Sequence, residues 1–200
     1  MIDRIVSEEE YCDLVFKGVA VPESKIVEAV FECCRFEGCD FSGVDFTGCE
    51  FLDCVFVKCN LSVIKVVDVK CVNTEFVDCK MIGIDWTCSA WGNMTLSSTV
   101  TFARCLMHDA SFFGLTLKGF VMRDCKAIDI DFREANFISA VFNGSDFKGS
   151  LFNNTQLAKA SFVQCINYNI DIYENNIKGA IFSRIEAISL LAGLDIKLVD

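Results

Sequence analysis

The sequence is poor in residues that separate one folded unit from another. Pro22 is its only proline, and no Pro-, Ser- or Gly-rich linker divides the 200 residues. We therefore expect a single well-buried domain. No apolar run reaches the 18 or so residues that a transmembrane helix needs, so we expect no contact with a membrane.

A signal peptide and an excess of basic residues are also missing. The first ten residues, MIDRIVSEEE, lack the basic segment and apolar core of a signal peptide. The chain has 13 cysteines, an odd number, and without a secretion signal they favour a reduced, cytoplasmic protein. Its 18 basic residues stand against 28 acidic ones, and the net charge of −10 argues against direct binding of DNA or RNA.

Phenylalanine, by contrast, is abundant and regularly spaced. In FEGCDFSGVDFTGCEFLDC, which starts at residue 36, it stands at every fifth position. Every fifth residue from Tyr11 to Leu96 is apolar or aromatic. The frame then slips by one residue, and the rule resumes from Phe102 to Phe182 with Asn167 as the exception. Neither an α-helix nor a β-strand has a period of five, so the spacing indicates a repeat architecture.

Two further positions of the repeat are specialised. We call the apolar residue at every fifth position the centre of its unit. Two residues before each centre the side chain is small, as at Cys34 and Ala135, and the residue between the two is often polar, as at Asn136. This is the in–out–in alternation of a short strand. Glycine is frequent two residues after the centre, where the chain must turn. Four such units close a square coil of 20 residues, and coils stacked at about 4.8 Å bring the aromatic residues into solid columns.

The units CDFSG, VDFTG, ANFIS and SDFKG resemble the pentapeptide-repeat family, whose motif is A-D/N-L/F-x-x. The resemblance covers residues 11–182, with residues 1–10 as a lead-in. It implies an all-β solenoid, specifically a right-handed quadrilateral β-helix of pentapeptide repeats.

The segment 183–200 departs from the five-residue rule and predicts a short C-terminal α-helix. Ser183 and Glu186 match a capping box at its start, and Gly193 predicts its end. The segment must cap the solenoid; either that is its only role, or it also forms a homodimer. It resembles the tails of Qnr, MfpA and albicidin-resistance proteins, which dimerise in this way. The predicted interface consists of Ile185, Ile188, Leu190, Leu191 and Leu194.

The frame slip predicts a loop within residues 88–100, centred on residues 91–98. It is either a harmless bulge with Trp91 packed on the coil or a projecting contact loop. Qnr-like and albicidin-resistance proteins carry such loops, and the stretch FVDCKMIGIDWT, the loop and the tail together look most like the albicidin-resistance branch. In the second case the partner-binding residues are Trp91, Gly92, Asn93, Met94 and Thr95.

The repeat shows no sign of catalysis or of a cofactor. His108 follows a central residue without the partners of a catalytic triad, and a solid rod lacks the pocket of most enzymes. Cysteines such as Cys34 and Cys39 are five residues apart, whereas zinc pairs are about two to four apart. We expect the cysteines to fill the core as small apolar side chains. We expect no enzymatic activity, no metal site and no cofactor.

The resemblance implies a function. Qnr- and MfpA-like proteins act as DNA mimics on DNA gyrase or topoisomerase IV and alter the action of poisons such as a quinolone or albicidin. One side of the rod is defined by the column Phe112, Phe132, Phe152 and Ile172. Its candidate acidic residues, for contact or only for solubility, are Asp131, Glu134, Asp171 and Glu174. The alternative function is a structural or interaction scaffold that binds another protein.

Overall fold

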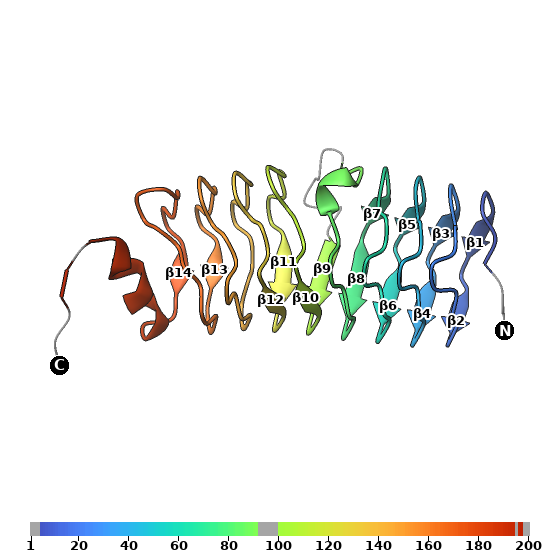
Figure 1. Ribbon diagram of the computed structural model, residues 1–200, viewed down its shortest axis with the longest axis horizontal. Helices are drawn as coiled ribbons and strands as arrows, with labels where there is room; N and C mark the ends of the chain where they lie inside the picture. The colour runs from blue at the N-terminus through green and yellow to red at the C-terminus, as the bar shows by residue number, and fades with distance from the viewer. Residues whose placement is uncertain (1–4, 92–99, 195, 198–200) are drawn as a thin grey trace.

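The computed structural model describes residues 5–91, 100–194 and 196–197. The chain winds as a parallel β-solenoid that advances from the N-terminus to the C-terminus along the long axis of a rod (Figure 1). It makes about eight turns. The all-β solenoid expected from the five-residue period is therefore confirmed.

Short parallel strands cover the sides of the rod. One sheet, in the order β1-β3-β5-β7, consists of β1 (Glu10–Cys12), β3 (Val30–Glu32), β5 (Glu50–Leu52) and β7 (Lys70–Val72). A second, in the order β11-β9-β8-β6-β4-β2, consists of β2 (Val15–Lys17), β4 (Arg35–Glu37), β6 (Val55–Val57), β8 (Thr74–Val77), β9 (Val100–Ala103) and β11 (Val121–Arg123). The other strands of the described residues form two pairs: β10 (Leu106–His108) with β12 (Lys126–Ile128), and β13 (Ser161–Phe162) with β14 (Ile181–Phe182).

Strand register confirms the turn of 20 residues. Phe16 pairs with Phe36, and Phe36 pairs with Phe56. The backbone amide of Phe41 donates to the carbonyl of Asn60 at 2.8 Å, and the same bond recurs along the rod. Successive coils therefore satisfy each other's backbone polar groups.

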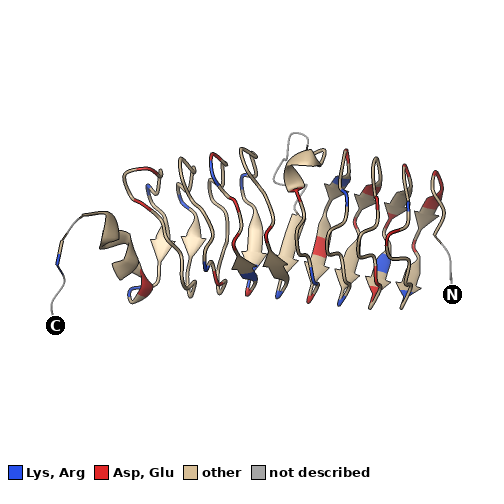
Figure 2. Ribbon diagram, in the orientation of Figure 1, with Lys and Arg blue, Asp and Glu red and all other residues tan. Residues whose placement is uncertain are grey.

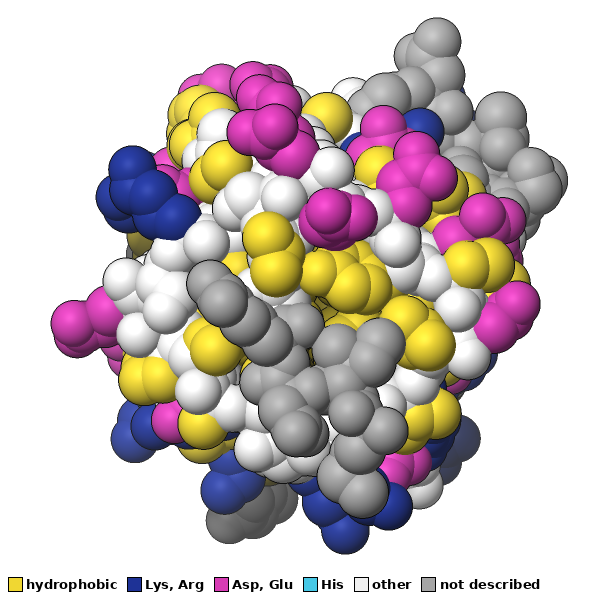
Figure 3. Space-filling view, turned by 90° about the vertical axis from the view of Figure 1, so that its right-hand side faces the viewer, with side chains coloured by type: hydrophobic (Ala, Val, Ile, Leu, Met, Phe, Trp, Pro, Cys, Tyr) yellow, Lys and Arg dark blue, Asp and Glu magenta, His cyan; other side chains and the backbone are white. Residues whose placement is uncertain are grey.

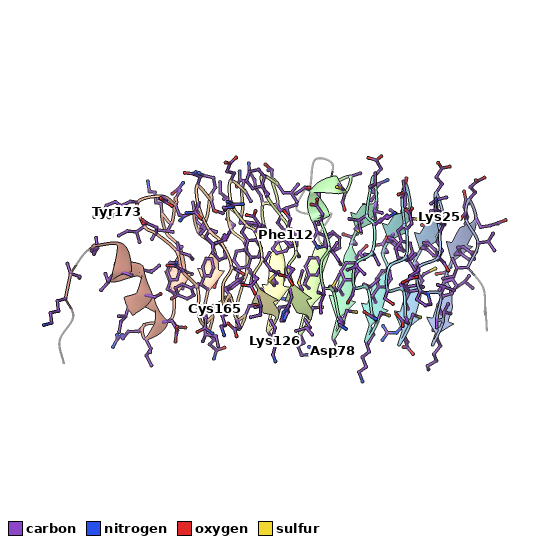
Figure 4. The ribbon with its side chains drawn as sticks, viewed as in Figure 1. Lys25, Asp78, Phe112, Lys126, Cys165 and Tyr173 are labelled. Atoms are coloured by element: carbon purple, nitrogen blue, oxygen red, sulfur yellow. The ribbon has the colours of Figure 1, made fainter. Side chains whose placement is uncertain are left out.

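Aromatic rings fill the axis in columns. The ring centroids of Phe36 and Phe56 are 4.4 Å apart, with an angle of 8° between the planes. Rings from adjacent sides meet edge to face, as Phe31 and Phe36 do at 5.4 Å and 71°. Both geometries are favourable for aromatic pairs. Figure 4 shows Phe112 inside the rod and Tyr173 outside it.

The corners have positive φ angles whether or not they hold glycine. Asp53 has φ 53°, and even the β-branched Val63 has φ 51°. Glycine leaves room where coils crowd: at Gly149, with φ 74°, a Cβ would collide with Oδ1 of Asp129 in the preceding coil and displace that side chain. Elsewhere the hydrogen bonds between coils hold other residues in the left-handed conformation.

One coil in the middle of the rod is longer than the others. Phe76 pairs with Phe102, 26 residues later, so this coil contains six additional residues. The sequence shows a slip of only one residue, because inserting five further residues does not change the five-residue spacing. The long segment begins with the 3₁₀ helix η1 (Trp86–Cys88). Residues 92–99 lie outside the described residues.

The last coil departs from the predicted register. The expected centres were positions 167 and 172, but the buried residues are Tyr168 and Ile170, at 3% and 2% exposure. Phe152 accordingly bridges to Ile170. The polar Asn167 instead turns a corner at φ 57°, and its Nδ2 donates to Asp146 Oδ1 at 2.7 Å. An amide side chain avoids the apolar axis because it would lose its hydrogen bonds there.

The C-terminal helix is also different from the prediction. It is the 3₁₀ helix η2 (Glu186–Leu194) and not an α-helix. Ser183 does not form the predicted capping box: its Oγ accepts a hydrogen bond from the backbone N of Gln164 at 2.7 Å, so it caps the preceding coil. Leu190 packs against the end of the core.

Candidate functional site

The negative charge of the chain is concentrated at the N-terminal end of the rod. Residues 1–60 contain 13 of the 28 acidic residues but five of the 18 basic ones, which leaves −8 of the total charge of −10 in these residues. Acidic positions mark each of the N-terminal coils (Figure 2). The charge is therefore distributed unevenly along the axis.

Much of this charge lies on one side of the rod. We call this surface the acidic face: sheet β1-β3-β5-β7 with its bordering corners, namely segments 8–13, 28–33, 48–53 and 68–73. Viewed from the N-terminal end, acidic side chains gather mainly along the upper and right-hand outline (Figure 3). The carboxylates of the acidic face belong to Glu8, Glu9, Glu10, Asp13, Glu28, Glu32, Glu50, Asp53 and Asp68.

Few groups in the acidic face offset these charges. Lys70 is the one cation of the four segments, all of which are described, and its Nζ lies 2.9 Å from Oε2 of Glu50. Asn73 donates its Nδ2 to Oδ1 of Asp53 at 3.0 Å, which satisfies that carboxylate without neutralising it. The face thus carries nine acidic residues and one basic residue, a net charge of −8.

The charge density of the acidic face is close to that of DNA. Its four coils, stacked at about 4.8 Å, span about 14 Å from first to last. Duplex DNA carries one charge per roughly 1.7 Å of axis, or about eight over the same length. The rod as a whole is far less charged than DNA, so the similarity is local. The five-residue period does not reveal this face, but counting charges coil by coil would have found it.

The four carboxylates predicted from the sequence do not form a continuous surface. Nη2 of Arg133 lies 2.7 Å from Oδ2 of Asp131, and this hydrogen bond lowers the pKa of the Asp131 carboxyl. Glu134 is exposed at the following corner. The apolar Leu151 bridges to Asp131 from the next coil. An uncharged position therefore follows Asp131 along this side of the rod.

The second predicted pair belongs to the irregular last coil. Oδ1 of Asp171 accepts a hydrogen bond from the backbone N of Tyr173 at 2.7 Å. Glu174 accepts a short hydrogen bond from Nδ2 of Asn153. Both carboxylates line a hollow with Asn169. Asp171 and Glu174 thus accept hydrogen bonds within the chain itself, and these bonds do not require a partner protein.

The tail presents an apolar row. Ile185 and Ile188 are 80% and 55% exposed, and Leu191 and Leu194 are half-buried. Side chains three residues apart eclipse one another in a 3₁₀ helix, so these four align along one edge. Leu190 faces the core instead. The predicted interface residues are therefore divided between the core and an open edge.

Of the predicted loop residues, the structure describes Trp91. Its Nε1 donates to the carbonyl of Trp86 at 2.7 Å, and its ring lies 5.7 Å from the Trp86 ring and 6.5 Å from that of Phe112. Trp91 thus packs on the coil, the first of the two alternatives for this residue. Gly92, Asn93, Met94 and Thr95 lie outside the described residues.

The buried cysteines are surrounded by apolar groups. Burial raises the pKa of Cys54 to about 12 and that of Cys49 to about 11, so both thiols are protonated at neutral pH. Among the described residues, no group of three or more His, Cys, Asp or Glu side chains is placed to hold a metal ion. In the same residues, no helix has the length and apolarity to cross a membrane.

Comparison with family models matches both halves of the rod. The model described as "Pentapeptide repeat region" matches residues 29–100, and that described as "Pentapeptide repeats (8 copies)" matches residues 130–166. Together the two matches cover more than half of the chain. No curated protein sequence matches significantly.

Several solved structures share the fold. A trypsin-treated variant of QnrB1, described as a plasmid-mediated fluoroquinolone resistance protein, is 19% identical over 94% of this chain and 99% of that chain, with a TM-score of 0.56. Full-length QnrB1 is 21% identical over 94% and 100%, with a TM-score of 0.38. HetL, a pentapeptide repeat protein involved in heterocyst differentiation regulation in the cyanobacterium Nostoc sp. strain PCC 7120, is 13% identical over 88% and 84%, with a TM-score of 0.33. At these identities the likeness concerns the fold alone.

Proposed function

The chain belongs to the pentapeptide-repeat family, and from this premise we propose that it is a non-enzymatic, cytoplasmic DNA mimic. It binds a type II topoisomerase, DNA gyrase or topoisomerase IV, where that enzyme binds DNA. The observation that carries the proposal is the acidic face, whose charge density is close to that of a duplex. A basic DNA-binding groove would attract this end of the rod first.

Binding in place of DNA has a consequence for poisons of the enzyme. A poison such as a quinolone or albicidin traps the complex of enzyme and cleaved DNA, and a protein that displaces DNA reduces the amount of that complex. The fold shared with QnrB1, described as a fluoroquinolone resistance protein, supports this outcome. The chain accordingly protects its target.

The tail completes the proposal by joining two copies. The apolar row of Ile185, Ile188, Leu191 and Leu194 is open to solvent or half-buried, and a second copy of the same row would cover it. Two rods of about 40 Å joined tail to tail give about 80 Å, with an acidic face at each far end. A topoisomerase with two-fold symmetry can then make the same contacts with each half.

Competition with DNA tests the proposal. Purified gyrase is incubated with labelled duplex DNA and increasing amounts of the protein, and bound DNA is measured; drug-induced cleavage is followed in parallel. We expect the protein to displace DNA and to reduce cleavage. If both bind together without interference and cleavage is unchanged at saturating protein, the proposal is wrong.

Two variants with equal charge removed locate the contact surface. The first neutralises four carboxylates of the acidic face: Glu10→Gln, Asp13→Asn, Glu32→Gln and Asp53→Asn. The matched control neutralises the four carboxylates predicted from the sequence, which lie nearer the C-terminus on the adjacent side and its corner: Asp131→Asn, Glu134→Gln, Asp171→Asn and Glu174→Gln. We expect the first variant to lose most of its affinity for gyrase and the second to lose little. The reverse result would move the contact to the side predicted from the sequence.

The scaffold function is the alternative outcome of these experiments. Protein that is dimeric and folded but does not bind either topoisomerase would leave the acidic face as a surface for another basic partner. Removal of the four carboxylates of the acidic face would then abolish binding to that partner instead.

A further inference from the structure

Two exposed cysteines lie close together on the first two coils. Cys12 and Cys33 are both exposed, whereas most of the other cysteines are buried. Cys12 pairs in register with Glu32, the residue immediately before Cys33. The repeat places one of them at the end of β1 and the other at the corner after β3.

The register brings their Cα atoms within disulfide range. Adjacent coils are separated by about 4.8 Å along the axis, and successive Cα atoms by about 3.8 Å, so the diagonal from Cys12 to Cys33 is about 6 Å. Disulfides join Cα atoms about 4.4–6.8 Å apart. Cys34, the next residue, points inward and is 1% exposed, so it is not available to an oxidant.

We infer that Cys12 and Cys33 form a redox modification site, a dithiol that a low-molecular-weight disulfide such as oxidised glutathione converts to an intramolecular disulfide. The product joins the first coil covalently to the second. The dithiol is the stable form in a reducing cytoplasm, where disulfides are transient and redox-sensing.

The chemistry is two successive thiol–disulfide exchanges. The thiolate of Cys12 attacks one sulfur of glutathione disulfide, whose S–S bond breaks, and one glutathione thiolate leaves. The thiolate of Cys33 then attacks the Cys12 sulfur of the mixed disulfide, and the second glutathione leaves. The protein loses two electrons and two protons, and one glutathione disulfide becomes two molecules of glutathione.

The surroundings make this a slow reaction at neutral pH. The hydrogen bond from the Cys12 thiol to Oδ2 of Asp13, at 3.5 Å, raises the pKa of Cys12. Desolvation, followed by the carboxylates of Asp13 and Asp53, raises the pKa of Cys33. Because the thiolate is the nucleophile, the reaction is best followed at about pH 8.5, near the ordinary thiol pKa.

Peptide mapping tests the inference on the full chain. Reduced protein is incubated with oxidised glutathione, free thiols are blocked with N-ethylmaleimide, and the protein is digested with trypsin. Cleavage after Arg4, Lys17, Lys25 and Arg35 separates the two cysteines, so the disulfide appears as peptide 5–17 linked to peptide 26–35. We expect this linked species, loss of two hydrogens from the intact mass, and full reversal by a dithiol reductant.

Three single variants make the result decisive. Cys12→Ser and Cys33→Ser should each abolish the linked species, and Cys88→Ser, which removes another exposed thiol, should leave it unchanged. Linkage that persists in Cys33→Ser would assign the bond to Cys34 and overturn the inference. Mixed glutathione adducts without any link between the two peptides would overturn it as well.

Thermal unfolding tests the covalent join. Oxidation should raise the unfolding midpoint of the wild-type chain, because a disulfide restricts the unfolded state, and should leave the Cys12→Ser midpoint unchanged. Equal midpoints for oxidised and reduced wild-type protein would refute the stapling of the two coils. None of these measurements involves gyrase, so their failure is distinct from a failure of the proposed function.

Discussion

At the scale of the residue, each five-residue unit divides its side chains between an apolar axis and the solvent. Phe137 is fully buried, with its ring centroid 5.4–5.5 Å from those of Phe132 and Phe142. Asn136, one position earlier, is half-buried, and its Oδ1 accepts a hydrogen bond from the backbone N of Ile138 at 3.2 Å. Adjacent residues therefore contribute to stability in different ways.

Phe137→Ala should lower the free energy of unfolding by about 3–5 kcal/mol, because it removes a ring from the packed axis and leaves a cavity. Asn136→Ala should cost about 1 kcal/mol, since it removes one partly exposed hydrogen bond. Urea unfolding of both variants measures the difference. Similar losses at the two positions would contradict the assignment of inward and outward residues.

Val63 is strained by its corner. Its φ of 51° is unfavourable for a β-branched residue, and its side chain is 57% exposed, so little burial offsets the strain. Val63→Asn should stabilise the protein by about 1 kcal/mol, because asparagine adopts this conformation more readily. Val67→Asn is the matched control, because Val67 is exposed but is not at a positive φ. Equal stability changes for the two variants in urea would contradict the strain argument.

At the scale of the element, the solenoid tolerates an insertion because each coil needs only its neighbours. Sheet pairing continues from β8 to β9 across the six additional residues, with Phe76 opposite Phe102. Arg104 and Asp78 also join the two coils, with Nε and Oδ1 2.7 Å apart. The inserted segment is therefore not needed to hold the flanking coils together.

Deletion of residues 93–98 should restore the turn of 20 residues and leave the unfolding midpoint nearly unchanged. Trp91 is kept because its ring packs on Trp86 and Phe112. We expect the deletion to reduce protection of gyrase from a poison more than it reduces binding, measured by cleavage and by competition assays. A Gly/Ser segment of the same length separates the effect of length from that of side chains. Full protection by both variants would show that the segment is only a bulge.

The tail is the element that should set the oligomeric state. Ile188→Asp places a charge in the apolar row, and burying an unpaired charge between two copies is strongly unfavourable. We expect a monomeric mass by light scattering, with the β-signal in circular dichroism retained. Arg184→Asp, at an exposed position just outside the row, should remain dimeric. A dimeric mass for Ile188→Asp would place the interface elsewhere.

At the scale of the whole molecule, charge varies along the axis while the fold does not. The N-terminal coils carry most of the net charge, and the C-terminal half has acidic and basic residues in nearly equal numbers. Long-range attraction by such a molecule acts mainly through one end. Salt screens this attraction over about 10 Å at 0.1 M ionic strength.

The association rate with gyrase should therefore fall steeply as salt increases. The acidic-face variant, with Glu10, Asp13, Glu32 and Asp53 neutralised, should associate more slowly and respond much less to salt, because steering depends on these charges. Stopped-flow measurement at several salt concentrations tests this. The control variant at Asp131, Glu134, Asp171 and Glu174 should keep the steep dependence; equal slopes for the two variants would exclude steering by the acidic face.

The sequence by itself determined the repeat and therefore the fold. A period of five has one simple solution, a four-sided coil, because every unit buries its centre in the same way, and the columns through Phe36 and Phe132 follow from counting. The same counting could have located the acidic face, since outward positions are also periodic. Local pattern is sufficient where each coil meets only its neighbours.

Only the tertiary structure decided the places where the period is broken. An insertion of five residues before Phe102 does not disturb the five-residue spacing, so the sequence pattern cannot detect it. The pairing between coils was needed to show it. The burial of Tyr168 and Ile170 in place of positions 167 and 172 was decided by competition for the apolar axis, where an amide is costly. Likewise, Ser183 caps the preceding coil and not the tail helix, because its Oγ accepts the hydrogen bond from the backbone N of Gln164, 19 residues earlier in the chain. Contacts between residues about 20 positions apart settle these points, and no local pattern encodes them.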